Sequence, residues 1–448
     1  MSDSSSDSSF DVIVVGASLA GCASAALLAQ QGWRVALLER HAKPEVYKHL
    51  CTHFIQASAL PALRALGLDR LIEQAGGIRN GAEFHTPHGW VGADLGPAPD
   101  GSALHGYSIR RSKLDPMVRR LAEGTPGVSL MAGWTVRGLV REGGQAGARI
   151  CGVKAWHEGQ EVTLSARLVV AADGRASEMA RVAGIPARTS GNTRHGVAVT
   201  LRGVDLQRGE LSQMWMTGPE VAYVFPNDDG TTVLAWVAPK ATLQGRSRAQ
   251  LWDDLLARIR SLPEGPQLRQ VEPVHELMVA RDYPCQWRPP VSQGMALVGD
   301  AATSLDYIHG VGCGWAFQSA QWLAQALGAA PKEGHAVDVH ALDLALKAYA
   351  SQHERALAGH RFFINDFARR RHFNAFERLF FAAAAKDAAF ARRMGRVGAR
   401  IDSPVGLLSP AVLARAVWIN LRHGKATPQG TRQALPAPQA RTSDRQVA

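Results

Sequence analysis

Two kinds of hydrophobic periodicity alternate near the start of this 448-residue chain. Residues 11–15 (DVIVV) and 33–38 (WRVALL) are continuous apolar runs of strand length, as in parallel strands that are buried on both faces. Between them, residues 22–32 carry Ala and Leu at helical spacing and end at a glycine. The pattern predicts a strand–helix–strand unit of about 30 residues, the context in which a glycine-rich turn binds a nucleotide.

Further along the chain, strand and helix patterns follow one another in mixed order. Residues 128–170 have the pattern of short alternating strands, with a hairpin connection at 143–147. Residues 196–239 show the alternation of an antiparallel sheet, divided by an NDDG turn at 227–230. After residue 345 the pattern is almost wholly helical until Pro428. Other helices are predicted at 57–76, 113–122, 248–261 and 315–327, and other strands at 82–95 and 295–300.

These patterns predict an α/β protein that is too long for one ordinary core. We expect a Rossmann-like domain with a parallel sheet and a β-meander in three layers, an antiparallel-sheet substrate domain, and a helical C-terminal region. The expected partition is a disordered leader at 1–9, the discontinuous Rossmann-like domain at 10–80, 105–195 and 285–345, the substrate domain at 81–104 and 196–284, the helical region at 346–427, and a flexible tail at 428–448.

The cysteines and the apolar segments bear on location and on metals. Five cysteines are scattered without a C-x-x-C motif, which favours a reducing cytoplasm and argues against a disulfide framework or a metal cluster. No apolar stretch approaches the roughly 18 residues of a membrane span. The polar start, MSDSSSDSSF, lacks the regions of a signal peptide. We therefore expect a cytoplasmic protein with no metal site.

Basic residues gather toward the C-terminus. The net charge is +11, and residues 354–432 hold fifteen Lys or Arg against five Asp or Glu. Because no recognisable nucleic-acid-binding module accompanies them, we expect no nucleic-acid partner. Eight of the 13 phenylalanines fall between Phe362 and Phe390, interleaved with arginines. Such helices either rest on anionic lipid, which gives a peripheral membrane contact, or form a cap that packs on the Rossmann-like domain or a second subunit.

The first candidate binding motif is VVGASLAG, residues 14–21, directly after the first strand. In the dinucleotide fingerprint the first glycine permits a tight turn, the second lets the backbone approach the pyrophosphate, and the third allows close helix–strand packing. Gly16 and Gly21 hold the first and third positions, and Ser18 replaces the second with a hydroxyl that can bind a phosphate oxygen. The helix N-terminus favours an anion. Glu39 ends the second strand, where a carboxylate accepts ribose hydroxyls.

Two more turns follow buried strands. Asp173 begins a D-G turn after the strand LVVAA, and Asp300 stands in the G-D pair of ALVGDAATSLDYIHGVGCG, residues 296–314. The second of these segments continues into a glycine-rich run where backbone can lie against a flat ring, at Gly310, Gly312 and Gly314. The N–H groups that open the helix at Trp315 would then face the pyrimidine edge of a flavin, where negative charge develops on reduction.

Together, these three motifs resemble the FAD-dependent monooxygenase superfamily typified by aromatic hydroxylases, a fold shared with geranylgeranyl reductases and flavin halogenases. The segment RRSKLD, residues 110–115, matches the R-x-x-L-D of that family. The resemblance implies that Arg111 touches FAD, that Asp173 orders the loop near the pyrophosphate and the nicotinamide path, and that Asp300 binds a ribityl hydroxyl. The Rossmann-like domain is then the FAD-binding domain.

The chain departs from that family in several places. Thr303 stands at the histidine position of many hydroxylases, and Asp306-Tyr307 stands where the reductase branch usually has Asp-Pro. Position 180 is Ala where the D-G motif usually has an arginine, and Arg181 comes one residue later. These features, with the aromatic and basic C-terminal helices, look nearer to the geranylgeranyl-reductase-like branch. The W-x-W-x-I-P motif of flavin halogenases is absent, which argues against halogenation.

The primary functional prediction is an NAD(P)H-dependent FAD monooxygenase that hydroxylates or epoxidises an apolar or aromatic small molecule. The sequence has no second nucleotide-binding unit, which is compatible with NADPH or NADH as a transient reductant in this superfamily. The alternative is a flavin-dependent reductase of a carbon–carbon double bond in a prenyl chain or other lipid. A flavoprotein that binds FAD without catalysis remains a rival from another class.

Further candidate residues follow from the same resemblance. The segment KHLCTH, residues 48–53, lies where family members pass a loop over the isoalloxazine ring, and Lys48 and Arg40 are assigned to cofactor binding. His53 and His309 are the acid–base candidates, because imidazole titrates near neutral pH. Cys313 joins the cofactor-binding set, and Cys51 is also expected to lie beside the flavin. Candidates for the substrate floor are Trp215, Tyr223, Phe225 and Trp236, of which two are expected to face a pocket.

Overall fold

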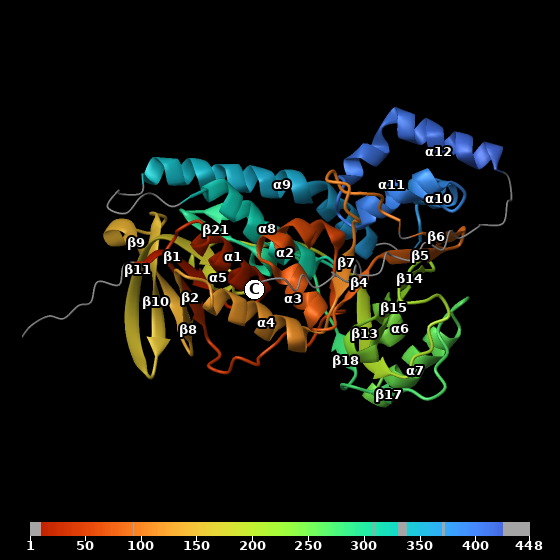
Figure 1. Cartoon of the computed structure of the whole chain (residues 1–448), viewed down its shortest axis with the longest axis horizontal. Coiled ribbons are helices and arrows are strands. Elements are labelled where there is room, and N and C mark those ends of the chain that lie inside the picture. The colour runs from red at the N-terminus through yellow and green to blue at the C-terminus, as the bar shows by residue number, and fades with distance from the viewer. Residues whose placement is uncertain (1–9, 93, 308–309, 330–337, 370–371, 424–448) are drawn as a thin grey trace, which may run out of the picture.

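The structure is a computed structural model that describes residues 10–92, 94–307, 310–329, 338–369 and 372–423. Its larger body is built on a parallel sheet (Figure 1). The central strands of this sheet are apolar runs buried on both faces, which is why they lack the alternation of a half-exposed strand. The strand order is β21 (Met295–Leu297), β11 (Gln160–Ala171), β1 (Phe10–Val15), β2 (Val35–Glu39) and β8 (Val128–Ala132), with β20 (Val291–Ser292) antiparallel at the edge.

Two different layers cover the parallel sheet. Val12 and Val14 face a helical layer, whereas Ile13 and Val15 face the opposite side, where an antiparallel meander extends from β11. The helical layer comprises α1 (Leu19–Ala29), α4 (Arg111–Glu123) and α8 (Gly312–Leu327), and the meander comprises β9 (Thr135–Arg141), β10 (Ile150–His157) and β11. The three layers confirm the predicted Rossmann-like fold class with its β-meander.

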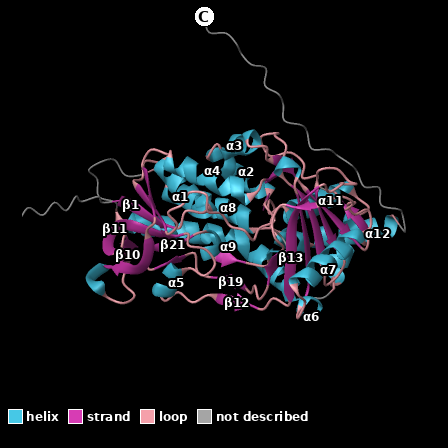
Figure 2. Cartoon of the chain, turned by 90° about the horizontal axis from the view of Figure 1, so that it is seen from below, coloured by secondary structure: helices cyan, strands magenta, loops and turns pink. Residues whose placement is uncertain are grey.

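A second sheet forms the smaller body beside the first (Figure 2). Its strands run in the order β17 (Glu272–Pro273), β13 (Arg194–Arg202), β16 (Thr232–Pro239), β15 (Val221–Pro226), β14 (Ser212–Met216), β5 (Ala82–Thr86) and β6 (Gly89–Val91), and β18 (Met278–Ala280) pairs with β13. The pairing is antiparallel except between β14 and β5, a parallel contact that the sequence pattern did not predict. Helix α7 (Arg248–Arg260) begins with a Ser247–Gln250 capping box and covers one face through Leu251 and Leu255.

Several phenylalanines of the C-terminal helices are buried against the second sheet. Phe367 and Phe373 pack against the second sheet, in one cluster with Met214 and Tyr223, and Phe380 and Phe390 are buried in a cluster that includes Val91 of the same sheet. This arrangement is the cap alternative: the Phe-rich segment covers the second sheet, whereas the first half of the long helix that leads into it packs on the helical layer of the parallel sheet (Figure 1). The helices are α9 (Val339–Arg369), α10 (Ala375–Ala384), α11 (Ala388–Gly398) and α12 (Pro410–Arg422).

Short elements connect these layers. The remaining helices are α2 (Leu60–Ala65), α3 (Leu68–Gln74), α5 (Glu178–Val182) and α6 (Lys240–Leu243). The remaining strands are β3 (Phe54–Ile55), β4 (Ile78–Asn80), β7 (Gly106–Ser108), β12 (Arg188–Ser190), β19 (Cys285–Trp287) and β22 (Thr303–Ser304), which make two small sheets. Within the described ranges, no helix is both long enough and apolar enough to cross a bilayer. The leader at 1–9 and the tail at 428–448 lie outside the described residues.

Candidate functional site

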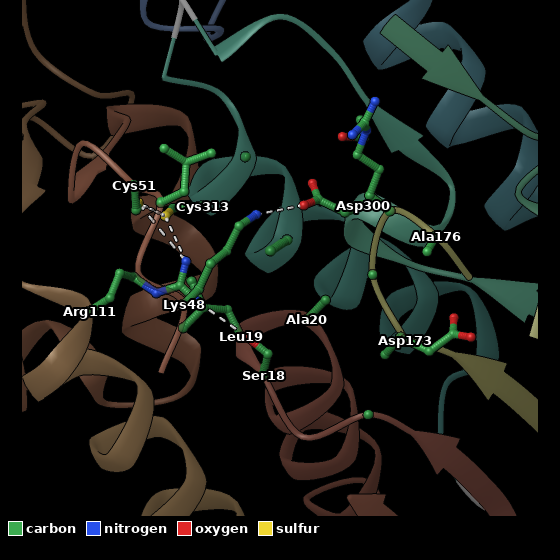
Figure 3. Close-up of a pocket in the computed structure, with 18 of the residues that line it drawn as sticks. Ser18, Leu19, Ala20, Lys48, Cys51, Arg111, Asp173, Ala176, Asp300 and Cys313 are labelled. Carbon is green, nitrogen blue, oxygen red and sulfur yellow. Dashed lines mark hydrogen bonds and ion pairs between the residues drawn. The ribbon is translucent and has the colours of Figure 1, made fainter. Parts of the chain in front are cut away.

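A cavity of about 1160 Å³ opens where the parallel strands end and reaches across to the second sheet. All three motifs contribute to its wall: residues 15–20, residues 172–179, and a segment that includes Asp300 and Gly312. Figure 3 shows that Ser18, Asp173 and Asp300 lie around one space although they come from distant parts of the chain. The topology explains this convergence, because β1, β11 and β21 are adjacent parallel strands whose carboxyl ends meet at one edge.

The turn after β1 is shaped by its glycines. Gly16 has φ of +103°, and a Cβ placed there would lie 2.6 Å from the carbonyl oxygen of Ala172. A Cβ on Gly21 would lie 1.8 Å from the carbonyl oxygen of Gly16. The first glycine therefore lets the turn pass against the end of β11, and the third lets α1 start directly above it. Ser18, the N-cap of α1, lines the cavity beside this helix N-terminus, which favours a bound anion.

Glu39 holds the first turn against the end of β2. One oxygen of its carboxylate accepts a hydrogen bond from the Ala17 N–H (2.8 Å), and the other accepts one from the His41 N–H (3.0 Å). Each oxygen keeps a second lone pair that can accept from a ribose hydroxyl. Arg40 follows in the cavity wall, where its Nε lies 3.2 Å from Nε2 of His41.

A network of charged side chains, buried at Arg111 and Asp115, joins α4 to the cavity (Figure 3). The guanidinium of Arg111 donates to the Asp115 carboxylate (2.9 Å from Nη2) and to the Ser18 hydroxyl (3.1 Å). Asp115 also accepts from the Lys48 N–H (3.0 Å), and Lys48 Nζ donates to Asp300 (2.9 Å). The charge of Asp300 raises the pKa of Lys48, so this lysine stays protonated. The network thereby ties the first and third motifs together through the R-x-x-L-D segment.

Sequence reasoning recognised Arg111 but missed the roles of two other residues on the same helix. Asp115 fixes Arg111, and Arg119 donates to the carbonyl oxygens of Ala17 (3.2 Å) and Val46 (3.1 Å). The three charged residues recur every four positions on α4, so they share one helix face. Charged side chains at that spacing on a buried face were the signal that could have found them.

Asp173 does not project freely into the cavity. Its carboxylate accepts from the Ser177 hydroxyl (2.7 Å) and from the Met179 N–H (2.9 Å), and it therefore orders its own D-G turn. Burial raises the pKa of the Asp173 carboxyl above its usual value. Arg181, which stands one position after the usual family arginine, points to an exposed pair with Glu178 (2.7 Å).

Cys51 and Cys313 both line the cavity, and their sulfur atoms lie 3.7 Å apart. Cys51 also accepts from the His53 N–H (3.2 Å), and the Arg111 guanidinium lies 3.8 Å from Cys313 Sγ. The hydrogen bond from Cys313, together with His53 and Arg111, holds the pKa of Cys51 well below that of an ordinary thiol, and the same pairing raises the pKa of Cys313. Cys51 therefore has more thiolate character than an ordinary cysteine.

This lowered pKa predicts unusual alkylation behaviour. As the pH falls from about 8 to about 6, Cys51 should keep its reactivity with iodoacetamide, because a thiol reacts as its thiolate and Cys51 loses that form only below its depressed pKa. Cys151, whose pKa burial raises, should slow by about tenfold per pH unit. Site-resolved mass spectrometry of the labelled protein measures both cysteines in one sample. An equal decline at the two sites would contradict the assignment.

Three predicted site residues do not line the cavity. Gly21 lies inside α1, and Gly314 faces Gln56 instead, since a Cβ added to it would lie 3.7 Å from the Gln56 Cβ atom. His53 is buried behind the wall, where Nδ1 accepts from the Arg111 N–H (3.2 Å). The other acid–base candidate, His309, lies outside the described residues. The predicted site residues that do line the cavity are Gly16, Ser18, Glu39, Arg40, Lys48, Arg111, Asp173, Asp300, Gly310, Gly312 and Cys313.

The far end of the cavity is aromatic and apolar. Of the four floor candidates, Tyr223 lines it, and Phe225 lies two residues along the same face of β15. Trp215 and Trp236 point to the opposite face, into the cluster under α7. Two further tyrosines that were not predicted as lining residues, Tyr283 and Tyr307, stand edge to face in the wall, with ring centroids 5.6 Å apart.

Asp306 and Tyr307, which depart from the family pattern, have different roles: Asp306 forms a buried ion pair, and Tyr307 lines the cavity. Asp306 accepts from Arg194 (3.0 Å) and from Asn192 (2.6 Å), and both charged side chains are almost completely buried. Tyr307 packs over Gly196, where a Cβ would lie 2.5 Å from its hydroxyl oxygen. The ion pair therefore anchors the loop that brings Tyr307 to the cavity wall.

Comparison with known proteins agrees with this geometry. Residues 9–356 match the family model described as FAD binding domain. The chain belongs to this family of FAD-binding proteins. It is accordingly an FAD-dependent oxidoreductase, and the predicted resemblance to the FAD-dependent monooxygenase superfamily is confirmed.

Individual relatives match different lengths of the chain. Kynurenine 3-monooxygenase from Salinispora arenicola is 28% identical over 347 residues, which are 73% of this chain and 74% of that protein. Digeranylgeranylglycerophospholipid reductase 1 from Methanopyrus kandleri is 34% identical over 185 residues, only 39% of this chain and 42% of that protein. The solved structure of p-nitrophenol 4-monooxygenase from Pseudomonas putida has a TM-score of 0.68 at 19% identity and covers 88% of this chain and 99% of that one. At this identity it shows the shared fold alone.

Proposed function

We propose that this protein is an NAD(P)H-dependent FAD monooxygenase that acts on an apolar or aromatic small molecule in the cytoplasm. The observation that carries the proposal is the single cavity that begins at the phosphate-binding turn of α1 and ends at the apolar floor beside Tyr223. A relative with monooxygenase activity matches nearly three quarters of the chain.

The cavity residues fit FAD. The turn at Gly16 leaves no room for a Cβ, and the N–H groups of α1 and the Ser18 hydroxyl would bind the pyrophosphate. Glu39 would accept from the adenosine ribose, and Asp300, oriented by Lys48, would accept from a ribityl hydroxyl. When bound, FAD would accept a hydride from NADPH or NADH and then react with oxygen.

The chain itself supplies orientation and exclusion of water. Tyr223, Tyr283 and Tyr307 would hold an aromatic substrate by packing against its faces and edges. The floor strands β15 and β16 are buried along almost their whole length, so solvent reaches this end of the cavity poorly. Poor access of water protects a reactive oxygenating site from futile side reactions.

Oxygen stoichiometry tests the proposal. With a productive phenol or indole, NAD(P)H oxidation should consume about one O₂ per nicotinamide, and one atom from labelled ¹⁸O₂ should appear in the product. The Gly16→Ala variant, which should lack flavin, gives the background rate. Substrate turnover that continues at full rate without oxygen would contradict the proposal.

The second candidate is reduction of a carbon–carbon double bond in a prenyl or other lipid chain. It is favoured by the 34% identity to a digeranylgeranylglycerophospholipid reductase across 185 residues. Under strictly anaerobic conditions, with NADPH or NADH as the reductant, a reductase should convert a prenyl lipid into a product heavier by two hydrogens. The same anaerobic incubation therefore separates the two candidates.

A further inference from the structure

A second, smaller cavity of about 50 Å³ lies next to the main one along the same face of the second sheet. Phe54 and Gly310 belong to the walls of both cavities. Phe225 continues the floor from Tyr223, its ring centroid 5.2 Å from that of Phe54. Because roughly 10–15 Å³ of such volume holds one water molecule, the space accepts a small polar group.

One cation lines this mainly apolar space, whose other polar side chains are the neutral amides of Gln56 and Asn80. Arg400 directly follows the C-cap of α11 and lines the same wall as Phe225 and Met214. Within the described part of the chain, its side chain makes one hydrogen bond, from Nη1 to the Val397 carbonyl oxygen (3.1 Å). Its Nε is shielded from solvent and has no acceptor. A guanidinium carries five N–H donors, so most of its hydrogen-bonding capacity is unused.

The surroundings of Arg400 offer no compensating anion among the described residues. The nearest carboxylate in sequence, Asp402, is held by Arg396 at 2.8 and 3.0 Å. Burial, followed by the charge of Arg400, lowers the pKa of His360 to about 3, so this histidine is neutral. Burial also lowers the pKa of Arg400 to about 10, with no neighbouring acid to oppose the shift. The cavity therefore has an unbalanced positive charge at one end.

The backbone at Arg400 supports a role for its side chain. It has φ of +63° directly after the C-cap of α11, where glycine is the favoured residue because a Cβ is disfavoured in the left-handed region. A bulky residue kept at such a position is a reason to look for a function of the side chain.

We propose that Arg400 binds a carboxylate group of the substrate, so that the substrate class is an apolar or aromatic carboxylic acid. This inference rests on the proposed function, since it places the apolar part of the same substrate against Tyr223. The acid end would enter the second cavity where the two walls meet, at Phe54 and Gly310, and accept two parallel hydrogen bonds from the guanidinium, the geometry that arginine and carboxylate share.

Binding of matched acids and amides tests this assignment. Isothermal titration calorimetry of the FAD-loaded protein would compare benzoate with benzamide and octanoate with octanamide. Wild type should bind at least one acid about 10- to 100-fold more tightly than its amide, in the range of a charged hydrogen bond. Arg400→Gln should remove that preference and leave amide binding unchanged, whereas Arg400→Lys should keep part of it.

Arg393→Gln is the matched control, because Arg393 is an exposed arginine of the same helix. It should bind acids as wild type does. The assignment is overturned if wild type prefers neither acid over its amide, a result that needs no variant to fold, or if Arg400→Gln retains the preference. Neither outcome depends on oxygen, so a failure here is distinct from a failure of the oxygenase proposal.

Discussion

Gly16→Ala should yield a folded protein that has lost its flavin. The new Cβ would lie 2.6 Å from the Ala172 carbonyl oxygen and 3.2 Å from Cα of Asp173, both backbone atoms that cannot rotate away. The first turn must then move away from the end of β11, which opens the pyrophosphate site at the start of α1. We expect FAD affinity to fall by about 100-fold or more, equivalent to roughly 2.7 kcal/mol. Flavin absorbance per mole of purified protein measures the loss.

Gly67→Ala provides the control for backbone strain. Gly67 also has a positive φ, +67°, but a Cβ there meets nothing within 4 Å. Both variants therefore carry the cost of a left-handed alanine, and only Gly16→Ala crowds the cavity wall. The variant at Gly67 should keep its full flavin content. Equal flavin content in the two variants would show that the first turn does not hold the cofactor.

Removing Arg194 should destabilise the whole protein. Its guanidinium bonds Asp306 at 3.0 Å, and the side chains are 1% and 0% exposed. Arg194→Met leaves a buried carboxylate without its cation, a change that typically costs about 3–5 kcal/mol. The free energy of unfolding in urea should fall by that amount, and the loop carrying Tyr307 should lose its anchor.

Arg248→Ala is the surface counterpart. Arg248 pairs with Glu276, but the side chains are 61% and 86% exposed, so its removal should cost no more than about 1 kcal/mol. The double variant Arg194→Met with Asp306→Leu should recover part of the lost stability, because neither charge is then buried alone. If Arg194→Met were as stable as Arg248→Ala, the pair would not anchor the loop.

Elements with a strong local pattern were predictable from the sequence. The buried run of β1 and the small residues of α1 follow from hydrophobic periodicity, and α7 was predicted at 248–261 and observed at Arg248–Arg260. The predicted start of α8 was too late in the chain. It begins at Gly312 rather than Trp315, because Cys313 and Gly314 are buried there and tertiary contacts extend the helix through residues that form helix poorly in isolation.

Long-range contacts were not predictable in the same way. The parallel pairing of β14 with β5 joins segments more than a hundred residues apart, and no local periodicity encodes a register of that kind. The C-terminal cap was one of two alternatives for the same Phe-rich pattern, since burial against β6 and adsorption on lipid require the same amphipathic helices. Arg400 carried no sequence signal, because its cavity exists only when α11 packs on the second sheet.

The site residues also differ in whether local sequence or tertiary packing determines their position. Residue types fixed by a turn, such as Gly16 and Asp300, could be found from motifs because their chemistry depends on the adjacent strand. His53 looked like an acid–base group in sequence, yet it is buried behind the wall beside Arg111. Tertiary packing, which the sequence pattern does not reveal, keeps this side chain out of the cavity. Its catalytic role, like that of His309, stays a prediction.

The most direct test is the visible absorption spectrum of the purified protein, repeated after incubation with excess FAD and removal of the unbound nucleotide. The convergence of β1, β11 and β21 on one cavity predicts a yellow protein with about one FAD per chain. Protein that is colourless from the start and remains so after the incubation would contradict the assignment of this cavity to the cofactor.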